Sequence, residues 1–245
     1  MSTGTSFTIG GTPLFQVLRE LRKRLLFVAL AWLAAFLTAW PLREYIMAFV
    51  ELPLSPYTKL TFDTLTAPFM THFKASAYAA LFVTLPLIML QAWLLLRRRL
   101  TGRERRLIWP FLLLSYPLFV GGALFCYWLV FPVAVKFFVE FDRTIVPSLR
   151  VDEYLTFTLR LLVVFGIVFE MPLVSLLLTR AGLLTPEFLS RNRRYAIVLL
   201  FMGAAVLTPP DVLSMMMLAV PLMLLYEISI LVARISRPRR PPGAA

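Results

Sequence analysis

Long runs of apolar residues alternate with short polar segments along this chain of 245 residues. A helix needs ~20 apolar residues to cross a hydrocarbon core of ~30 Å. Runs near or above that length are Leu25–Leu42, Ala75–Leu96, Leu107–Val135, Leu161–Thr179, Tyr195–Pro210 and Val212–Ala233. The pattern predicts an all-α polytopic membrane protein with six transmembrane helices, at about 25–42, 75–96, 107–135, 154–179, 195–210 and 212–233.

Composition supports a membrane protein without a soluble domain. Hydrophobic residues make up 60% of the chain and charged residues 16%, against about 45–50% and about 25% in soluble proteins. We therefore expect one membrane domain over 1–245, with flexible tails at 1–13 and 236–245. The first run is expected to be a retained span, because it lacks a convincing signal-peptide cleavage site. The loop 43–72 is expected to lie partly at the interface, with short helical pieces.

The basic residues are distributed unevenly between the two sets of loops. The N-terminus, the loops 97–106 and 180–194 and the C-terminus together hold 18 of the 25 Lys and Arg residues. Short loops rich in Lys and Arg stay in the cytoplasm, so both termini are predicted to be cytoplasmic. The net charge of +12 is thereby explained by membrane orientation, and no nucleic-acid partner is expected.

Residues for catalysis or metal binding are sparse. The chain has one cysteine, Cys126, and one histidine, His72, and it contains no HExxH motif and no Gly-rich phosphate loop. The predicted spans contain no Ser/His or paired Asp arrangement, which disfavours an intramembrane hydrolase. We expect no enzyme activity, no cofactor and no metal site.

Two acidic residues stand among arginines at the predicted cytoplasmic edge, namely Glu20 in LRELRKRL and Glu104 in RERR. One interpretation is local ion pairing, with Glu20 neutralised by Arg24 at position i+4. The other is that each carboxylate binds an incoming guanidinium, which can form two parallel hydrogen bonds where lysine cannot. The neighbouring Arg22 and Arg105 would keep the carboxylates ionised.

The ordered motifs ELRKRL, LPLIMLQAW with RERR, FEMP, LTPPD and LYE together resemble the TatC family over residues 18–234. This family is the six-span receptor subunit of the twin-arginine protein translocase. The resemblance implies a curved wall of helices with a concave face, in the bacterial inner membrane. It implies that Glu20 and Glu104 bind the paired arginines of a signal peptide, supported by Arg22, Arg105 and Arg106.

The resemblance also implies the partners and the energy source. The expected partners are signal peptides of folded cargo, single-span subunits of the TatA and TatB type, lipid, and further copies of the chain within the complex. Translocation would depend on the proton-motive force without ATP.

Glu170 lies within the fourth run, where an ionised acid costs ~2.5 kcal/mol or more near the bilayer centre. Gly166 and Pro172 bracket it, and such residues bend helices. Glu170 is either a buried acid bonded to a neighbouring helix or part of a polar patch that receives the signal peptide or a partner helix. The alternative function for the chain is a proton-coupled small-solute transporter that uses Glu170.

Further candidate residues follow the fifth run. Pro209, Pro210 and Asp211 predict a structural turn, with Asp211 as the cap of the last helix. Glu227 is expected near the cytoplasmic interface. In the family, Thr208 and a nearby Gln dock the partner subunits, and this chain has Met215 at the Gln position. It also has Val17 where the family usually has His, and Arg97–Arg99 in place of a Pro-Gly-like turn.

Overall fold

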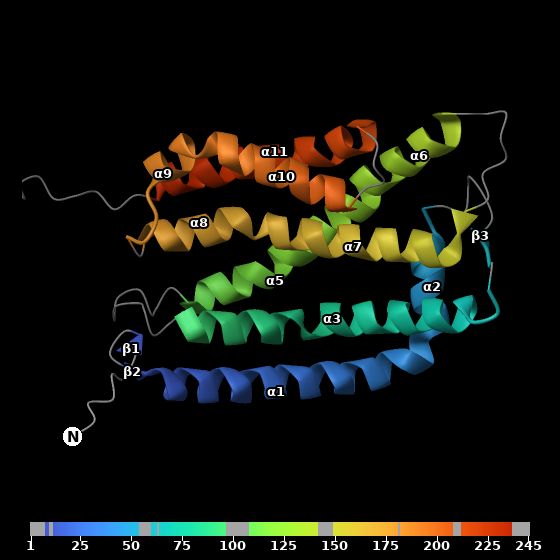
Figure 1. Ribbon diagram of the computed structural model, residues 1–245, viewed down its shortest axis with the longest axis horizontal. Coiled ribbons are helices and arrows are strands. Elements are labelled where there is room, and N and C mark those ends of the chain that lie inside the picture. The colour runs from blue at the N-terminus through green and yellow to red at the C-terminus, as the bar shows by residue number, and fades with distance from the viewer. Residues whose placement is uncertain are drawn as a thin grey trace, which may run out of the picture.

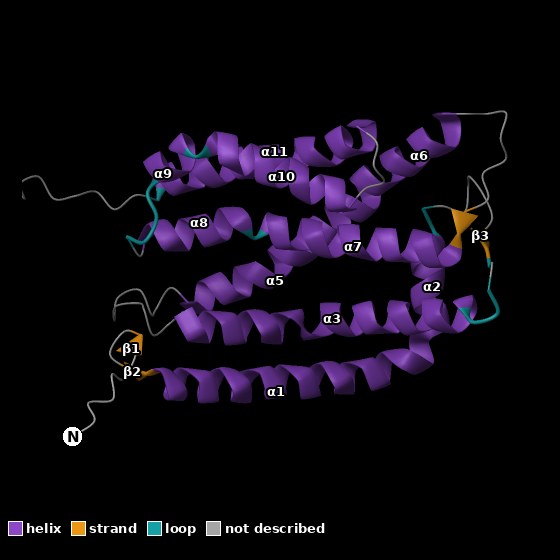
Figure 2. Cartoon of the chain, viewed as in Figure 1, coloured by secondary structure: helices purple, strands orange, loops and turns teal. Residues whose placement is uncertain are grey.

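The computed structural model describes residues 8–9, 12–53, 60–62, 64–96, 108–141, 149–180, 182–207 and 212–236. Nearly all of these residues are helical (Figure 2). In chain order the helices are α1 (Leu14–Ala39), α2 (Arg43–Glu51), α3 (Ala67–Leu96), α5 (Ile108–Phe125), α6 (Phe131–Phe141), α7 (Val151–Phe169), α8 (Met171–Arg180), α9 (Pro186–Arg191), α10 (Arg193–Leu207) and α11 (Val212–Ile235). The predicted all-α fold is confirmed.

Short irregular elements connect these helices. A 3-10 turn, η1 (Trp40–Leu42), joins α1 to α2, and a π-turn, η3 (Cys126–Val130), joins α5 to α6. Two-residue strands pair near the ends of the helices: β1 (Thr8–Ile9) with β2 (Thr12–Pro13), and β3 (Leu60–Thr61) with β4 (Leu149–Arg150). The parallel β3–β4 bridge links the loop before α3 to the start of α7. Other residues of the predicted tails, 1–7, 10–11 and 237–245, lie outside the described ranges.

The helices pack in a definite order. Helix α1 packs along α3, and α3 contacts α5 and α7; α8 continues from α7 and packs on α11, which also contacts α10. Figure 1 shows α1, α3, the α7–α8 pair and the α10–α11 pair as successive rows, with α5 running obliquely among them. Helix α2 turns across the far end of α3. Helix α1 and the α10–α11 pair lie at opposite margins of the arrangement (Figure 1).

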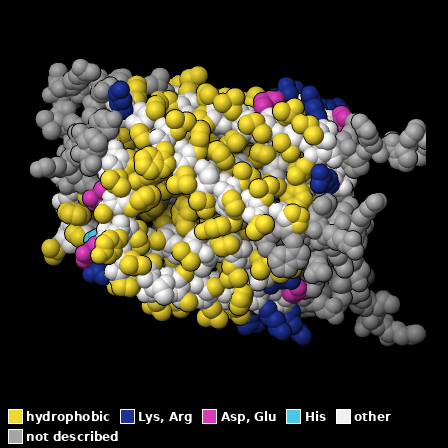
Figure 3. Space-filling view, turned by 180° about the vertical axis from the view of Figure 1, so that it is seen from behind, with side chains coloured by type: hydrophobic (Ala, Val, Ile, Leu, Met, Phe, Trp, Pro, Cys, Tyr) yellow, Lys and Arg dark blue, Asp and Glu magenta, His cyan; other side chains and the backbone are white. Residues whose placement is uncertain are grey.

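Among the described residues, five helical segments are long and apolar enough to cross a membrane: Arg19–Glu51, Ala67–Gln91, Leu113–Phe137, Val151–Arg180 and Met215–Ile235. The span predicted at 195–210 is not among them, so the count of six stays a prediction. Many large apolar side chains along them are exposed, including Leu30 and Leu37 of α1, and the broad apolar face carries its charges near its two ends (Figure 3). Such a surface requires lipid around it. The chain is a multi-pass membrane protein.

The helix boundaries differ from the apolar runs at several places. Helix α3 begins at Ala67 rather than near residue 75, because the backbone stays helical through the polar residues His72 and Lys74. The third run continues through η3 and α6 to Phe141. Helix α10 has 15 residues and therefore reaches ~22 Å at 1.5 Å per residue, short of a ~30 Å core.

Candidate functional site

The first predicted site residue, Glu20, forms an ion pair with Arg24 one turn further along α1. Arg24 Nη2 donates a hydrogen bond to Glu20 Oε1 at 2.7 Å, and Arg24 Nε donates to the same oxygen at 3.2 Å. The Glu20 side chain is 26% exposed and the Arg24 side chain 21%. The predicted i,i+4 ion pair is thus confirmed, and the carboxylate already holds a guanidinium of its own chain.

The same guanidinium also reaches the neighbouring helix. Arg24 Nη1 donates to the side-chain oxygen of Gln91 on α3 at 3.0 Å and to the Gln91 backbone oxygen at 3.3 Å. Arg24 therefore joins α1 to α3 close to the ends of both helices. Arg22 and Lys23 are exposed. Arg22, two residues from Glu20, lies on another face of α1, whereas Lys23, three residues away, lies next to Glu20. Both add to the positive potential around Glu20.

The second predicted acid and its supporting arginines, Glu104, Arg105 and Arg106, lie outside the described residues, as does the Arg97–Arg99 run. The structure describes both flanks of this segment. Helix α3 ends and α5 begins at the end of the molecule where α1 begins (Figure 1). This end also carries α9 and the last turn of α11, and we call it the basic end. Its described cations include Arg19, Arg22, Lys23, Arg24, Arg180, Arg191, Arg193, Arg194 and Arg234.

Glu170 marks a break between α7 and α8. Its backbone N–H donates to the Ile167 oxygen, a tighter turn than that of an α-helix, and the next helix resumes at Met171. Pro172 has no N–H to continue the ladder. The regular helix is therefore interrupted at Glu170, between Gly166 and Pro172, and a bend there stays a prediction.

The Glu170 side chain is buried against α5, and the residue is 8% exposed. Ser115 Oγ donates to Glu170 Oε2 at 2.5 Å. Glu170 Oε1 has no hydrogen-bond partner among the described residues. Glu170 therefore has one carboxyl oxygen with a hydrogen bond and one without, and a buried oxygen without a partner is costly.

Two glycines let α5 and α7 cross closely near Glu170. A Cβ atom added to Gly166 would lie 2.4 Å from the Phe119 ring, and one added to Gly122 would lie 2.6 Å from Phe169 Cγ. Small residues at helix crossings allow such close approach in membrane proteins. Phe119 and Phe165 are fully buried there, so the Glu170 region rests on a tightly packed crossing.

The remaining predicted residues are placed less completely. Thr208, Pro209, Pro210 and Asp211 lie outside the described residues. Met215, near the start of α11, is partly buried and packs against the apolar core. Glu227 is exposed at the basic end, where Arg193 Nη2 donates to its Oε2 at 2.9 Å. Within the described ranges, no cluster of three His, Cys, Asp or Glu residues could hold a metal ion.

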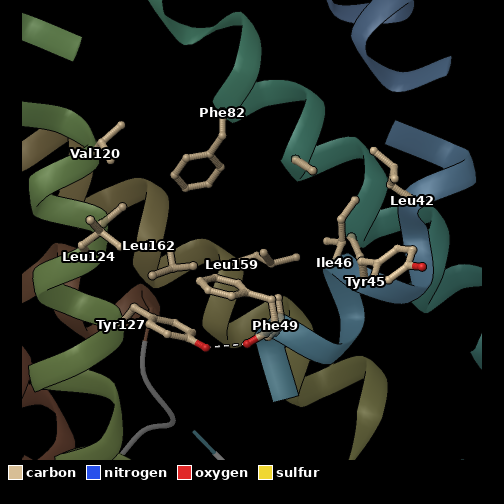
Figure 4. A pocket seen from close by; sticks show the side chains of 14 residues that line it. Leu42, Tyr45, Ile46, Phe49, Phe82, Val120, Leu124, Tyr127, Leu159 and Leu162 are labelled. Atoms are coloured by element: carbon tan, nitrogen blue, oxygen red, sulfur yellow. Dashed lines mark hydrogen bonds between the residues drawn. The ribbon is translucent and has the colours of Figure 1, made fainter. Parts of the chain in front are cut away.

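A hollow with a wholly apolar lining lies towards the end of the molecule opposite the basic end. It has a volume of about 470 Å³ and is bordered by residues of η1, α2, α3, α5, η3 and α7. Figure 4 shows Phe49 and Tyr127 side by side at its rim, with the rings stacked at 4.6 Å. The hydroxyls of Tyr127 and Tyr154 donate to the backbone oxygens of Phe49 and Val50 at 2.5 and 2.8 Å, which secures α2 as one wall.

Comparison with known proteins places this geometry in a family. Residues 16–221 match the protein family described as Sec-independent protein translocase protein (TatC). The chain belongs to the TatC family. The matched range includes Glu20, Glu104, Glu170 and the LTPPD motif, and the resemblance seen in the sequence motifs is confirmed.

Individual TatC proteins agree over nearly the whole chain. The TatC protein of Magnetococcus marinus is 40% identical and covers 95% of this chain and 88% of that relative. The TatC protein of Aquifex aeolicus is 39% identical, with 91% and 95% covered. A crystal structure of a twin-arginine translocase receptor TatC superposes with a TM-score of 0.83 at 37% identity, covering 89% of this chain and 98% of that chain.

Within this TatC fold, sequence reasoning missed the partners of the acids. Ser115 and Arg193 donate hydrogen bonds to Glu170 and Glu227, and Gln91 accepts one from Arg24, the partner of Glu20; each comes from a distant part of the chain. Ser115 could have been noticed as a hydroxyl inside an uncharged span, because polar groups within the bilayer tend to face other polar groups. Gln91 lies in the LPLIMLQAW motif, but no local pattern indicates Arg24 as its partner.

Proposed function

We propose that this chain is the receptor for twin-arginine signal peptides and a core subunit of a translocase that exports folded proteins. Glu20 and Glu104 bind the paired arginines, and Arg22, Arg105 and Arg106 set the potential around them. The chain acts by binding and assembly, without a catalytic residue, cofactor or metal, and uses the proton-motive force.

The observation that carries this proposal is a partly exposed carboxylate that binds a guanidinium, within a chain that folds like a twin-arginine translocase receptor. Glu20 is partly exposed among cations at the basic end and binds the Arg24 guanidinium at 2.7 Å. This pair supports the proposal, because an arginine of a ligand would use the same kind of guanidinium–carboxylate hydrogen bond. The solute-transporter alternative receives no comparable support, because the relatives are named as protein translocase proteins.

The same proposal gives orientation and partners. The chain lies in a bacterial inner membrane with its basic end and both termini on the cytoplasmic side, as expected for short loops rich in arginine. Single-span TatA- and TatB-type subunits and further copies of the chain assemble with it. Glu170, Thr208, Met215 and Glu227 are the residues proposed to meet those partner helices.

Direct peptide binding tests the receptor proposal. We would measure the affinity of the purified full chain for a twin-arginine peptide and for the same peptide with two lysines. We expect the twin-arginine peptide to bind more tightly, because arginine forms two parallel hydrogen bonds with a carboxylate. Glu20→Gln and Glu104→Gln are each expected to weaken binding by about tenfold or more.

Glu187→Gln is a suitable control, because it removes one negative charge from the exposed α9 at the same end of the molecule. It is expected to leave the preference for arginine unchanged. Equal affinity for the two peptides, or equal effects of all three substitutions, would rule out Glu20 and Glu104 as the arginine receptors.

A further inference from the structure

We infer that Arg24 is a resident ligand of the Glu20 carboxylate, which an incoming arginine must displace. This inference rests on the proposed receptor function and adds to it a built-in competitor. Arg24 uses Nε and Nη2 on Glu20 Oε1, at 3.2 and 2.7 Å. These two bonds occupy the acceptor positions of Oε1, and an arginine that binds with two parallel hydrogen bonds needs both carboxylate oxygens.

The competitor is held in place from a second helix. Its third nitrogen, Nη1, is bonded to the side-chain and backbone oxygens of Gln91 at 3.0 and 3.3 Å. Gln91 thus fixes the plane of the guanidinium and offers it a partner that stays available when Glu20 is taken by the ligand. Both Glu20 and Arg24 retain some exposure, at 26% and 21%, so a ligand can reach the pair from the water.

Displacement makes a single cation an inadequate ligand. Arg24 is attached to the same helix as Glu20, so its local concentration at the carboxylate is on the order of millimolar or higher. A dilute peptide with one arginine exchanges one guanidinium for another and gains little. A second arginine bound at another carboxylate provides the additional free energy, and a lysine lacks the planar donors that replace those of Arg24.

Arg22 provides a matched comparison on the same helix. It has the same charge and lies two residues from Glu20, but it is exposed and on another face of α1. Removing Arg22 lowers the local positive potential and leaves Arg24 on the carboxylate. Removing Arg24 lowers the potential and also removes its two hydrogen bonds to Glu20 Oε1, so the difference between the two variants measures the effect of the resident ligand.

The test measures the affinity of three peptides, which carry Arg-Arg (RR), Lys-Arg (KR) or Lys-Lys (KK) at the paired position. Each is measured on the purified full chain as wild type, Arg24→Gln, Arg24→Lys and Arg22→Gln. For Arg24→Gln we expect the affinity for KR to rise by about tenfold, so that the ratio of RR to KR affinity falls. Arg24→Lys keeps the charge but loses the planar donors, and it should shift the ratio in the same direction. Arg22→Gln should change all three affinities by one similar factor.

Several outcomes would overturn the inference. Arg24→Gln could match Arg22→Gln, or it could weaken the binding of RR, which would make Arg24 a support for the site rather than a competitor. If Arg24→Gln does not fold, the same ratio of RR to KR affinity is measured on Arg24→Lys and on Gln91→Ala, which loosens the hold on Arg24. In both variants the ratio is expected to fall. Failure of the receptor function is separate: it appears as no preference for RR over KK in the wild type, whatever the variants do.

Discussion

Ser115 on α5 donates its hydroxyl hydrogen to Glu170 at the junction of α7 and α8, between residues 55 positions apart in the chain. The contact joins the closely packed crossing of α5 and α7 to the break in the fourth membrane segment. Because the other carboxyl oxygen of Glu170 has no partner among the described residues, this hydrogen bond is what offsets the burial of the acid in the described structure.

Ser115→Ala is therefore predicted to lower the free energy of unfolding by roughly 1–3 kcal/mol, because it leaves Glu170 buried without a partner. Ser76→Ala is the control: Ser76 is also buried, but its hydroxyl has no partner among the described residues, so its loss should be neutral or stabilising. Thermal unfolding in one detergent compares them, and equal stability of the two variants would contradict the prediction.

Gly122→Ala is predicted to destabilise the protein by about 1–3 kcal/mol, because its Cβ would meet Phe169 and the backbone oxygen of Phe165 at 2.6–2.8 Å. Gly121→Ala, one residue earlier on α5, meets nothing within 4 Å. It should gain about 0.5–1 kcal/mol from the lower flexibility of the unfolded chain. The melting temperature of Gly121→Ala is therefore expected to lie above that of Gly122→Ala. Equal stability of the two variants would mean that the helix crossing is looser than described.

Tyr154→Phe is predicted to loosen α2, because the Tyr154 hydroxyl bonds the Val50 backbone oxygen at 2.8 Å. The expected cost is about 0.5–1.5 kcal/mol, with faster hydrogen exchange at the end of α2. Tyr45→Phe, which removes an exposed hydroxyl from α2 itself, should leave exchange unchanged. Similar exchange in both variants would show that the Tyr154 bond does not secure this helix.

The Glu227–Arg193 pair is predicted to contribute little to stability, despite its distance of 2.9 Å. Its side chains are 51% and 44% exposed, and such pairs contribute no more than about 1 kcal/mol. A double-mutant cycle with Glu227→Gln and Arg193→Gln measures the coupling free energy, which should also shrink as salt is added. A coupling well above 1 kcal/mol, unaffected by salt, would indicate a drier environment than the structure gives.

Local spacing predicted some of these features well. The apolar runs predicted a helical membrane protein, the i,i+4 spacing predicted the Glu20–Arg24 ion pair, and Gly166 with Pro172 indicated a disturbed helix around Glu170. These features depend on neighbours within one or two helical turns.

Contacts between helices could not be predicted in this way. The Arg24–Gln91 and Ser115–Glu170 hydrogen bonds span 67 and 55 positions, and their formation depends on the rotation and crossing of whole helices. Helix α3 also begins eight residues before the apolar run that predicted the second span, because hydropathy measures apolar character and not backbone hydrogen bonding. The roles of Glu104 and of Thr208 to Asp211 stay predictions.

The packing order of the helices has a consequence for permeability. With α1 and α10 at opposite margins, the described helices of one copy do not close into a ring. Two hollows that they line, the apolar one beside α2 and one between α9 and the end of α11, hold about 470 and 630 Å³, respectively, room for a few side chains. On the proposed function, a passage wide enough for folded cargo must therefore be bounded partly by lipid or by other chains. The aperture would then be a property of the assembly rather than of a single subunit.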